Sequence, residues 1–440
     1  MQGQKPSTQE RWSSRLGFIL ATIGSAIGVG NLWRFPYLVG MNGGGAFLVP
    51  YFLAIALCGL PILMLELAGG RRFRQGVVGT FRAVRPVAGL VGAFIAFSSF
   101  LLLSYYLVVV GWAWGYLVHS LGGSFPAFGA YTSGYNSVLF FLVLCGVTVG
   151  IVGLGVRRGI ELASRILMPT LFLLVLGLAV FCTTLPGWRE GIVFYLYPKP
   201  SALADPLVWA AAFGQVFFSV GVGMGVMITY GSYAQEKEPI ASSSLWIVLA
   251  DASAALLAGF VVFPIVFSYG GEPAAGPGLA FDTLPHLFRQ FSGATGQVVA
   301  GLFYLLLGIA GIGPSVSLLQ TALVGLEEGI GVPRRRALPL VAVALVLLGL
   351  PSALSYSGGG LRLAGAPVLD ILDNLTGLVL LPLGVLATAV VLGWLAPTRL
   401  MVTDVQRGFV GWSGTWLVRF AVPLSILGVL GATVFQRLVR

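Results

Sequence analysis

The sequence predicts an all-α integral membrane protein with eleven transmembrane helices. We expect two inverted repeats of five helices each, with helices 1 and 6 unwound at the membrane midplane. The composition, the apolar segments and a pair of glycine-rich interruptions support this prediction. The chain has 440 residues, of which 57% are hydrophobic and 9% are charged. Because soluble domains carry about 25% charged residues, this composition indicates a polytopic membrane protein.

Eleven apolar segments are long enough to cross a bilayer, which takes roughly 20 residues in a helix. We expect the spans at residues 16–39, 45–69, 88–118, 137–155, 163–185, 207–234, 243–269, 295–325, 337–355, 367–395 and 415–436. The connecting segments contain no low-complexity tract and no soluble domain. Residues 1–440 are therefore expected to form a single domain embedded in the lipid bilayer.

The basic residues predict the orientation of the chain. Of the 25 Lys and Arg residues, 18 fall on the side of the N-terminus, six fall on the opposite side, and Arg34 lies within a span. Cytoplasmic loops carry the excess of Lys and Arg, so the N-terminus is expected in the cytoplasm. The odd number of spans then places the C-terminus outside. The net charge of +10 reflects this topology, and no nucleic-acid partner is expected.

The first span is interrupted by a polar run. Its members are Gly24, Gly28, Gly30, Asn31 and Arg34. Lipid cannot form hydrogen bonds with an unwound backbone, and a charge within the membrane costs several kcal/mol. Such a run is tolerated where a broken helix lines a cavity enclosed by protein. We therefore expect a binding site near the middle of the membrane.

A second interruption lies in the sixth span, at Gly221, Gly223 and Gly225. Because the two interruptions are five spans apart, their segments cross the membrane in opposite directions, as inverted repeats require. The repeats would cover residues 16–185 and 207–395, with 415–436 as an additional helix. Glycines also occur in membrane helices simply for close packing, but the nearby polar residues Gln215 and Ser219 favour a binding site.

Three segments resemble the neurotransmitter:sodium symporter family. They are residues 11–36, which contain RWSSRLGF and the polar run, residues 42–47 (NGGGAF) and residues 214–219 (GQVFFS). The resemblance covers nearly the whole chain. It implies the LeuT-like fold and a bacterial amino-acid transporter in the cytoplasmic (inner) membrane, working by alternating access as a monomer or weak homodimer.

The resemblance also implies a substrate site. Its residues would be Ser25, Ala26, Gly28, Gly30, Leu102, Tyr106, Phe218, Ser219, Gly221, Met224, Ser315 and Leu318. Monoamine carriers place an aspartate at the position of Gly28, so a glycine here favours substrates with their own carboxylate. The apolar lining favours hydrophobic L-amino acids with branched-chain, methionine or aromatic side chains.

Two sodium positions follow from the same resemblance. The first would use Ala26, Asn31, Ser219 and Asp251. An aspartate departs from the commoner asparagine there, and it could take up a proton when sodium leaves, which would allow proton counter-transport. The second position would use Gly24, Ile27, Ala310, Gly313 and Pro314. Gly313 and Pro314 stand where relatives have oxygen-bearing side chains, so the resemblance implies one complete sodium position and a second that lacks two side-chain ligands.

The resemblance implies a gate on each side of this site. Arg34 would close the outer side with Asp373, which we prefer to Asp370 because of its spacing to Gly377. On the inner side, Arg11 would face Glu328, with Tyr233 nearby.

The function implied is sodium-coupled import of hydrophobic amino acids. An amino-acid sensor or channel on the same fold, and a proton-coupled carrier independent of sodium, are the alternatives. An enzyme is not expected, because the spans contain no Gly-x-Ser-x-Gly motif, metal-spaced His pair or Cys–His pair.

Chloride should not be required. Chloride-dependent members of the family have a serine at the position of Ala255, whereas Asp251, one helical turn away, would repel an anion. Uptake of a hydrophobic amino acid should therefore continue when gluconate replaces chloride at constant sodium. Strict chloride dependence in this assay would show that Asp251 does not take the place of the chloride ion.

Overall fold

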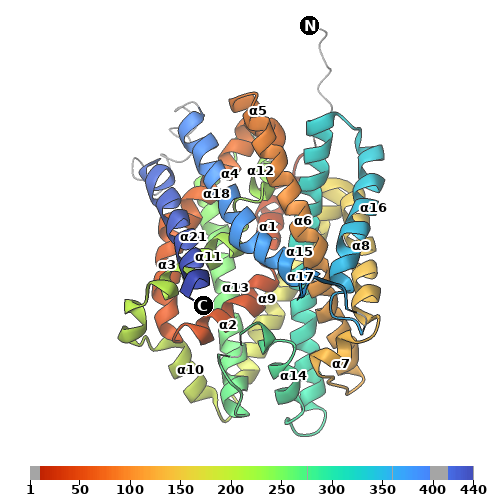
Figure 1. Ribbon diagram of the computed structural model, residues 1–440, viewed down its shortest axis with the longest axis vertical. Helices are drawn as coiled ribbons and strands as arrows, with labels where there is room; N and C mark the ends of the chain where they lie inside the picture. The colour runs from red at the N-terminus through yellow and green to blue at the C-terminus, as the bar shows by residue number, and fades with distance from the viewer. Residues whose placement is uncertain (1–9, 275, 359, 397–414, 440) are drawn as a thin grey trace.

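The computed structural model describes residues 10–274, 276–358, 360–396 and 415–439. Nearly all of this part of the chain is helical, and most helices run along the long axis of the molecule (Figure 1). The two strands in the described residues, β1 (Arg362–Leu363) and β2 (Ala366–Pro367), form a small antiparallel hairpin at the surface. The architecture is thus all-α, as predicted.

The helices of the first half are α1 (Arg15–Ala26), α2 (Phe35–Met41), α3 (Leu48–Ala54), α4 (Leu60–Phe73), α5 (Val77–Val84), α6 (Ala88–Leu121), α7 (Phe128–Thr132), α8 (Asn136–Gly153), α9 (Leu162–Cys182) and α10 (Trp188–Leu196). Those of the second half are α11 (Pro206–Ser219), α12 (Val226–Ser232), α13 (Ile240–Ser268), α14 (Thr283–Phe288), α15 (Thr295–Ile330), α16 (Arg334–Ala353), α17 (Val368–Leu375), α18 (Leu381–Val390) and α21 (Val422–Val439). Short π-helical segments join several of them, including Gly30–Arg34 before α2 and Val156–Glu161 before α9.

Eight helical segments in the described residues are long and apolar enough to cross a membrane. The bent pair Arg15–Ala26 and Gly30–Met41 makes a ninth when it is counted as one span. Two shorter apolar helices, Pro206–Ser219 and Leu417–Ala432, lie where spans 6 and 11 were predicted. Each predicted span therefore contains an apolar helix, although these last two are shorter than an uninterrupted span.

The first interruption bends the chain by 51° between α1 and the helix that follows. Helix α1 ends at Ala26, and Ile27 is extended with φ −73° and ψ 112°. Close packing explains the glycines, because a Cβ atom at Gly28 would lie 2.8 Å from Tyr106 Oη. A Cβ atom at Gly30 would lie 2.6 Å from Phe218 Cε1. The break therefore depends on residues that have no side chain.

The second interruption separates α11 from α12. Gly221, Gly223 and Gly225 all have positive φ values, of 71°, 77° and 70°, a conformation that residues with a side chain rarely adopt. The buried carboxylate of Glu66 accepts a hydrogen bond from the Gly223 N–H at 2.7 Å. An acidic side chain from α4 thus satisfies part of the unwound backbone.

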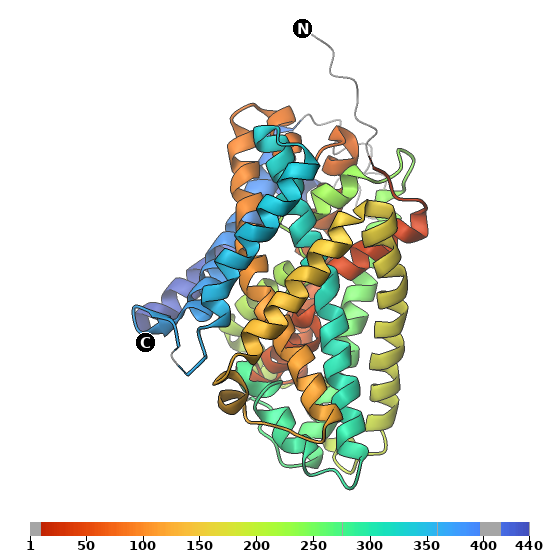
Figure 2. The same ribbon diagram turned by 90° about the vertical axis from the view of Figure 1, so that its right-hand side faces the viewer.

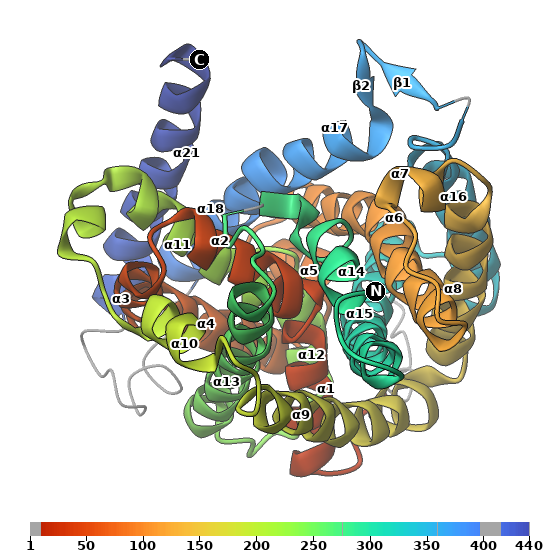
Figure 3. The same cartoon turned by 90° about the horizontal axis from the view of Figure 1, so that it is seen from below.

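The two broken helices lie at the centre of the molecule. Seen along the axis, α1 and α12 are surrounded by α4, α6, α9, α13 and α15 (Figure 3). Helix α1 contacts α9, α13 and α15 directly, while α12 packs on α4. Figure 2 shows α17, α18 and α21 running obliquely along one flank. The remaining helices thus form a scaffold around the two interruptions.

We use two names for the ends of the molecule. The inner end carries α5 and the start of α16, at the top of Figure 1, and the outer end carries α7, α10 and α14 at the bottom. These names follow the predicted topology.

Candidate functional site

A small cavity of about 30 Å³ lies between the two interruptions. Its lining consists of Ser25, Ala26, Gly28, Gly30, Asn31, Leu102, Tyr106, Phe218, Ser219, Gly221, Met224, Val226, Pro314, Ser317 and Leu318. The structure therefore brings together eleven of the twelve residues that the sequence suggested for a substrate site. The other four lining residues are Asn31, Val226, Pro314 and Ser317.

Ser315 is the exception and requires a correction. Its hydroxyl donates to the Gly311 carbonyl within α15 at 2.7 Å, and it does not line the cavity. Ser317 takes that place, and its Oγ lies 2.9 Å from Ser25 Oγ across the site. Residues two positions apart point in widely different directions from a helix. The polar sequence around Pro314 did not indicate which serine faces inward.

One end of the cavity is polar. Asn31 Nδ2 donates to Ser219 Oγ at 2.8 Å and to Asp251 Oδ1 at 2.7 Å, while Ser219 Oγ donates to Asp251 Oδ2 at 2.7 Å. All three side chains are buried. Asn31 lies in the segment Gly30–Arg34 between α1 and α2, Ser219 at the end of α11 and Asp251 in the middle of α13. The network therefore joins three parts of the chain.

The unwound backbone also has partners at the site. The Gly28 N–H donates to Asn31 Oδ1 at 3.1 Å, and the Val29 N–H donates to Tyr106 Oη at 3.2 Å. Gln215 Nε2 donates to the Gly30 carbonyl at 3.1 Å. Polar side chains therefore take over hydrogen bonds that a continuous helix would make within itself.

The donor set fits a hard monovalent cation better than a transition metal. Asn31, Ser219 and Asp251 supply amide, hydroxyl and carboxylate oxygens, which are the ligands that hard cations prefer. No group of three His, Cys, Asp or Glu side chains that could hold a metal occurs among the described residues. The predicted first sodium position is therefore chemically consistent with the residues present.

The predicted second sodium position is closely packed. A Cβ atom at Gly313 would lie only 1.9 Å from the Gly24 carbonyl oxygen, so α15 touches the backbone of α1 there. Pro314 faces the cavity instead. Ile27 and Ala310 are fully buried, and neither Gly313 nor Pro314 offers a side-chain oxygen.

A larger cavity of about 480 Å³ adjoins the first on its outer side. Gly30, Tyr106 and Phe218 line both cavities, so these residues separate them. Arg34 and Asp373 also line the larger cavity. We call this larger cavity the vestibule.

The predicted outer gate residues face each other across the vestibule without an ion pair in the described structure. Arg34 Nη1 donates to Gln215 Oε1 at 2.9 Å, and the guanidinium lies 5.0 Å from the centre of the Phe218 ring. Asp373 accepts a hydrogen bond from Tyr105 Oη at 3.0 Å. Asp370, the competing candidate, accepts one from Tyr356 Oη at 2.6 Å.

The inner end is closed by the segment before α1. Trp12 is 2% exposed, its indole N–H donates to the Tyr230 carbonyl at 3.0 Å, and its backbone N–H donates to the Tyr233 carbonyl at 3.1 Å. Tyr233 Oη accepts from Gln320 Nε2 at 2.7 Å. Helix α12 is thus tied both to the N-terminal segment and to α15.

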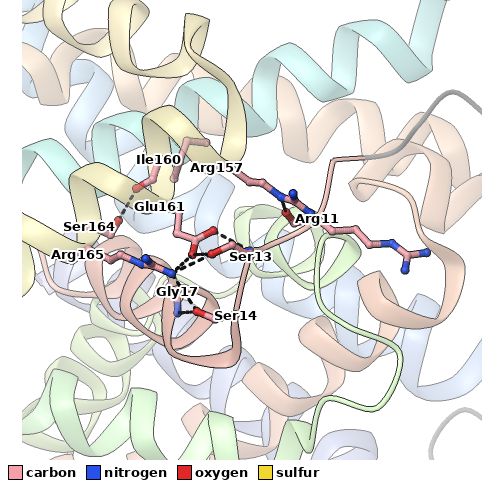
Figure 4. Close-up of polar contacts among 9 residues, drawn as sticks. All are labelled: Arg11, Ser13, Ser14, Gly17, Arg157, Ile160, Glu161, Ser164 and Arg165. Atoms are coloured by element: carbon pink, nitrogen blue, oxygen red, sulfur yellow. Dashed lines mark hydrogen bonds and ion pairs between the residues drawn. The ribbon is translucent and has the colours of Figure 1, made fainter.

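The expected pairing of Arg11 with Glu328 is wrong in this structure. Both carboxylate oxygens of Glu328 accept backbone N–H bonds, from Gly76 at 2.6 Å and from Gly79 at 2.8 Å. These donors lie at the N-terminus of α5, where free N–H groups and the helix dipole attract an acid. The Arg11 side chain points away from the contacts around Glu161 (Figure 4).

A second acid at the inner end was missed by the sequence analysis. Glu161 Oε2 accepts from the Ser13 N–H at 2.8 Å, and Glu161 Oε1 pairs with Arg165 Nη2 at 2.6 Å (Figure 4). Arg165 also donates to the hydroxyls of Ser13 and Ser14. A Cβ atom at Gly17 would lie 1.9 Å from Glu161 Oε1, so this contact requires a glycine in α1.

These contacts fasten the N-terminal segment to the π-helical segment Val156–Glu161 and the start of α9, and we call them the Glu161 latch. The signal for it was available in the sequence. Glu161 is the one acid among three arginines, Arg157, Arg158 and Arg165, in the short stretch around the start of the predicted fifth span. An acid beside several arginines at the end of a membrane helix is a candidate for an ion pair.

A central site between two interrupted helices, with a vestibule on one side and a closed segment on the other, is typical of membrane transporters. Comparison with known proteins agrees with this class. The family model described as "Sodium:neurotransmitter symporter family" matches residues 9–137 and 129–438. The chain belongs to this family, which consists of transporters and not of enzymes.

Relatives extend over nearly the whole chain. An uncharacterized sodium-dependent transporter of Bacillus subtilis is 34% identical, covering 97% of each chain. Another from Methanocaldococcus jannaschii is 34% identical over 88% of this chain and 82% of its own length. The crystal structure of MhsT in complex with L-phenylalanine matches with a TM-score of 0.86 and 37% identity, covering 96% of this chain and 99% of that one.

The Glu161 latch can be tested by removing its charge. Glu161→Gln should loosen the N-terminal segment, because hydrogen bonds to charged groups contribute about 1.5–3 kcal/mol. Amide hydrogen exchange of residues 10–17 should then rise by roughly tenfold to a hundredfold. Glu190→Gln, at an exposed acid on α10, is the matched control. Equal exchange in both variants would show that Glu161 does not hold this segment.

Proposed function

We propose that the chain is a sodium-coupled importer of hydrophobic L-amino acids that works by alternating access. In this proposal eleven helices cross the membrane, and residues 16–185 and 207–395 form inverted repeats with the N-terminus in the cytoplasm. The observation that carries it is the adjacency of a buried polar cluster, Asn31, Ser219 and Asp251, to a cavity with a mostly apolar wall. A cation and an apolar molecule would thus bind side by side.

The two ends of an amino acid would meet different parts of the broken helices. N-terminal ends of half-helices are positive and attract a carboxylate, whereas C-terminal carbonyls bind ammonium and sodium. The carboxylate would lie at Gly30, where a helix restarts, and at the Tyr106 hydroxyl. The cavity holds no acid positioned like that of a monoamine carrier, because Gly28 stands there. The substrate must therefore bring its own carboxylate.

The substrate side chain would contact an adaptable surface. Leu102, Met224 and Leu318 line the cavity, and methionine accommodates differently shaped apolar groups. L-phenylalanine in the related MhsT structure supports a hydrophobic amino acid here. The cavity of about 30 Å³ would have to widen for a large side chain, and Phe218, 2.6 Å from the Cβ position of Gly30, would have to shift.

Transport requires the two ends to open in turn. The outer gate would close when Arg34 leaves Gln215 and pairs with Asp373 across the vestibule. The inner end would open when Trp12 leaves α12 and the Glu161 latch releases α9. The π-helical segment Val156–Glu161 and Pro169 within α9 mark where that helix can unwind, because both weaken its hydrogen-bond ladder.

One sodium ion per substrate is the second part of the proposal. Asp251 and its neighbours would hold that ion with the Ala26 carbonyl. The direct contact of Gly313 with the Gly24 carbonyl argues against a second ion between α1 and α15. Asp251 could carry a proton back when sodium has left, which would add proton counter-transport.

The substrate site can be tested by uptake into proteoliposomes. Tyr106→Phe removes one hydroxyl that would face the substrate carboxylate, and affinity should fall roughly tenfold to a hundredfold. Tyr131→Phe is the matched control, because that buried hydroxyl has no hydrogen-bond partner among the described residues. Uptake of a panel of amino acids, measured with and without a sodium gradient, tests the substrate class and the sodium coupling. Unchanged affinity in Tyr106→Phe would refute the site, and uptake indifferent to sodium would refute the coupling.

Stoichiometry can be measured separately. Sodium activation of uptake should show a Hill coefficient near one, because only one position has side-chain oxygens. An opposing proton gradient should accelerate uptake, and Asp251→Asn should retain sodium dependence while losing the proton effect. Cooperative activation without any pH response would contradict this part of the proposal. It would mean that the second position binds sodium through backbone oxygens alone.

A further inference from the structure

An apolar groove of about 350 Å³ lies on the outside of the molecule, near its inner end. It runs between α6, α15 and α16, which contact one another and lie side by side in Figure 1. Its lining is Ala93, Ala96, Phe97, Phe100, Ala322, Gly325, Leu326, Gly329, Ile330, Leu340, Val341 and Ala344. None of these residues belongs to the substrate cavity or to the vestibule, so the groove is a separate feature.

Small residues give the groove its depth. A Cβ atom at Gly325 would lie 2.7 Å from the Ala96 Cβ atom, so α6 and α15 meet closely at its floor. Gly329, further along α15, would meet nothing within 4 Å. Phe97 is 57% exposed and Leu340 is 55% exposed, so its walls face outward. These exposed apolar residues belong to helices long enough to span the membrane, and the groove therefore faces lipid.

Positive charge lies directly beside the inner end of the groove. Arg336 precedes Leu340 by four residues, or about 6 Å along α16, and therefore shares its side of the helix. The side chains of Arg335 and Arg336 are exposed and make no hydrogen bond or ion pair within the described part of the chain. Arg85, just before α6, is exposed as well.

The nearby acids do not cancel this charge. Glu328 uses its carboxylate on the backbone N–H groups of Gly76 and Gly79. Glu327 pairs with Arg334 at 3.7 Å. Arg335 and Arg336 therefore remain available to an outside anion at the level where the apolar wall ends.

We propose that this groove binds one phospholipid with an anionic headgroup. An acyl chain lies in the groove against Phe97 and Leu340, and the phosphate meets Arg336 and Arg335. Basic pockets between transmembrane helices on the cytoplasmic side bind anionic headgroups, and each basic residue near the surface adds about fivefold to the affinity. The proposal does not depend on the identity of the transported substrate.

Native mass spectrometry of the full-length protein in detergent tests the proposal. The protein is titrated with phosphatidylglycerol and, separately, with phosphatidylcholine that has the same acyl chains. Two variants address the two parts of the site. Arg336→Gln removes a headgroup contact, and Gly329→Leu fills the groove at a position where a side chain meets no obstacle.

Each variant has a matched control. Arg158→Gln removes an exposed arginine elsewhere at the inner end. Gly146→Leu adds the same side chain on α8, where a Cβ atom also meets nothing within 4 Å. Both controls change charge or apolar surface equally without touching the groove.

The expected result is one tightly bound phosphatidylglycerol, with weaker binding of phosphatidylcholine. Arg336→Gln should weaken the binding of phosphatidylglycerol about fivefold. It should weaken the binding of phosphatidylcholine less, because the positive choline group offsets the charge of that lipid's phosphate. Gly329→Leu should weaken the binding of both lipids. Equal lipid binding by the variants and their controls would overturn the proposed lipid site. A dimer that Gly329→Leu dissociates without any change in lipid binding would also overturn it, because a second copy of the chain would then occupy the groove.

Discussion

The backbone of the two interrupted helices must find hydrogen-bond partners in an apolar interior, and much of the architecture answers this requirement. Unpaired N–H and C=O groups in such surroundings cost several kcal/mol each. Here Asn31, Tyr106 and Gln215 satisfy groups of the first interruption, and Glu66 satisfies one of the second. Each of these side chains is buried, and this requirement explains why polar residues occur within such apolar segments.

The same requirement links the stability of the fold to its function. Tyr106 and Asn31 stabilise the break, and they also line the cavity where the proposed ligands would bind. A ligand that takes over some of these hydrogen bonds changes which backbone arrangement is favoured. Ligand binding and conformational change thus involve the same polar groups. A ligand shifts a conformational equilibrium only when it binds one conformation more tightly than the other.

Much of this arrangement could be predicted from the sequence, because its signals are incompatible with ordinary membrane helices. The glycines beside the polar residues Asn31 and Arg34 favoured a broken helix that lines a cavity, and the cavity contains eleven of the twelve predicted substrate-site residues. The rotation of α15, which places Ser317 and not Ser315 in the site, depends on packing that no local pattern records. Glu328 was predicted to pair with Arg11, but its carboxylate binds the free N–H groups at the N-terminus of α5. Arg34 and Asp373 show a further limit: both line the vestibule, but in this structure they bind Gln215 and Tyr105 and not each other.

The contact between Gly313 and Gly24 has an energetic consequence for a carrier of this kind. A membrane potential of 100 mV supplies about 2.3 kcal/mol for each charge that crosses, which corresponds to roughly a fiftyfold concentration ratio. With one ion per cycle, the steepest substrate gradient rises with the first power of the electrochemical sodium ratio. With two ions it would rise with the square. Under the proposed one-ion cycle, packing two glycines at the second position would therefore lower the attainable gradient, and it would halve the sodium that the cell must pump out for each molecule imported.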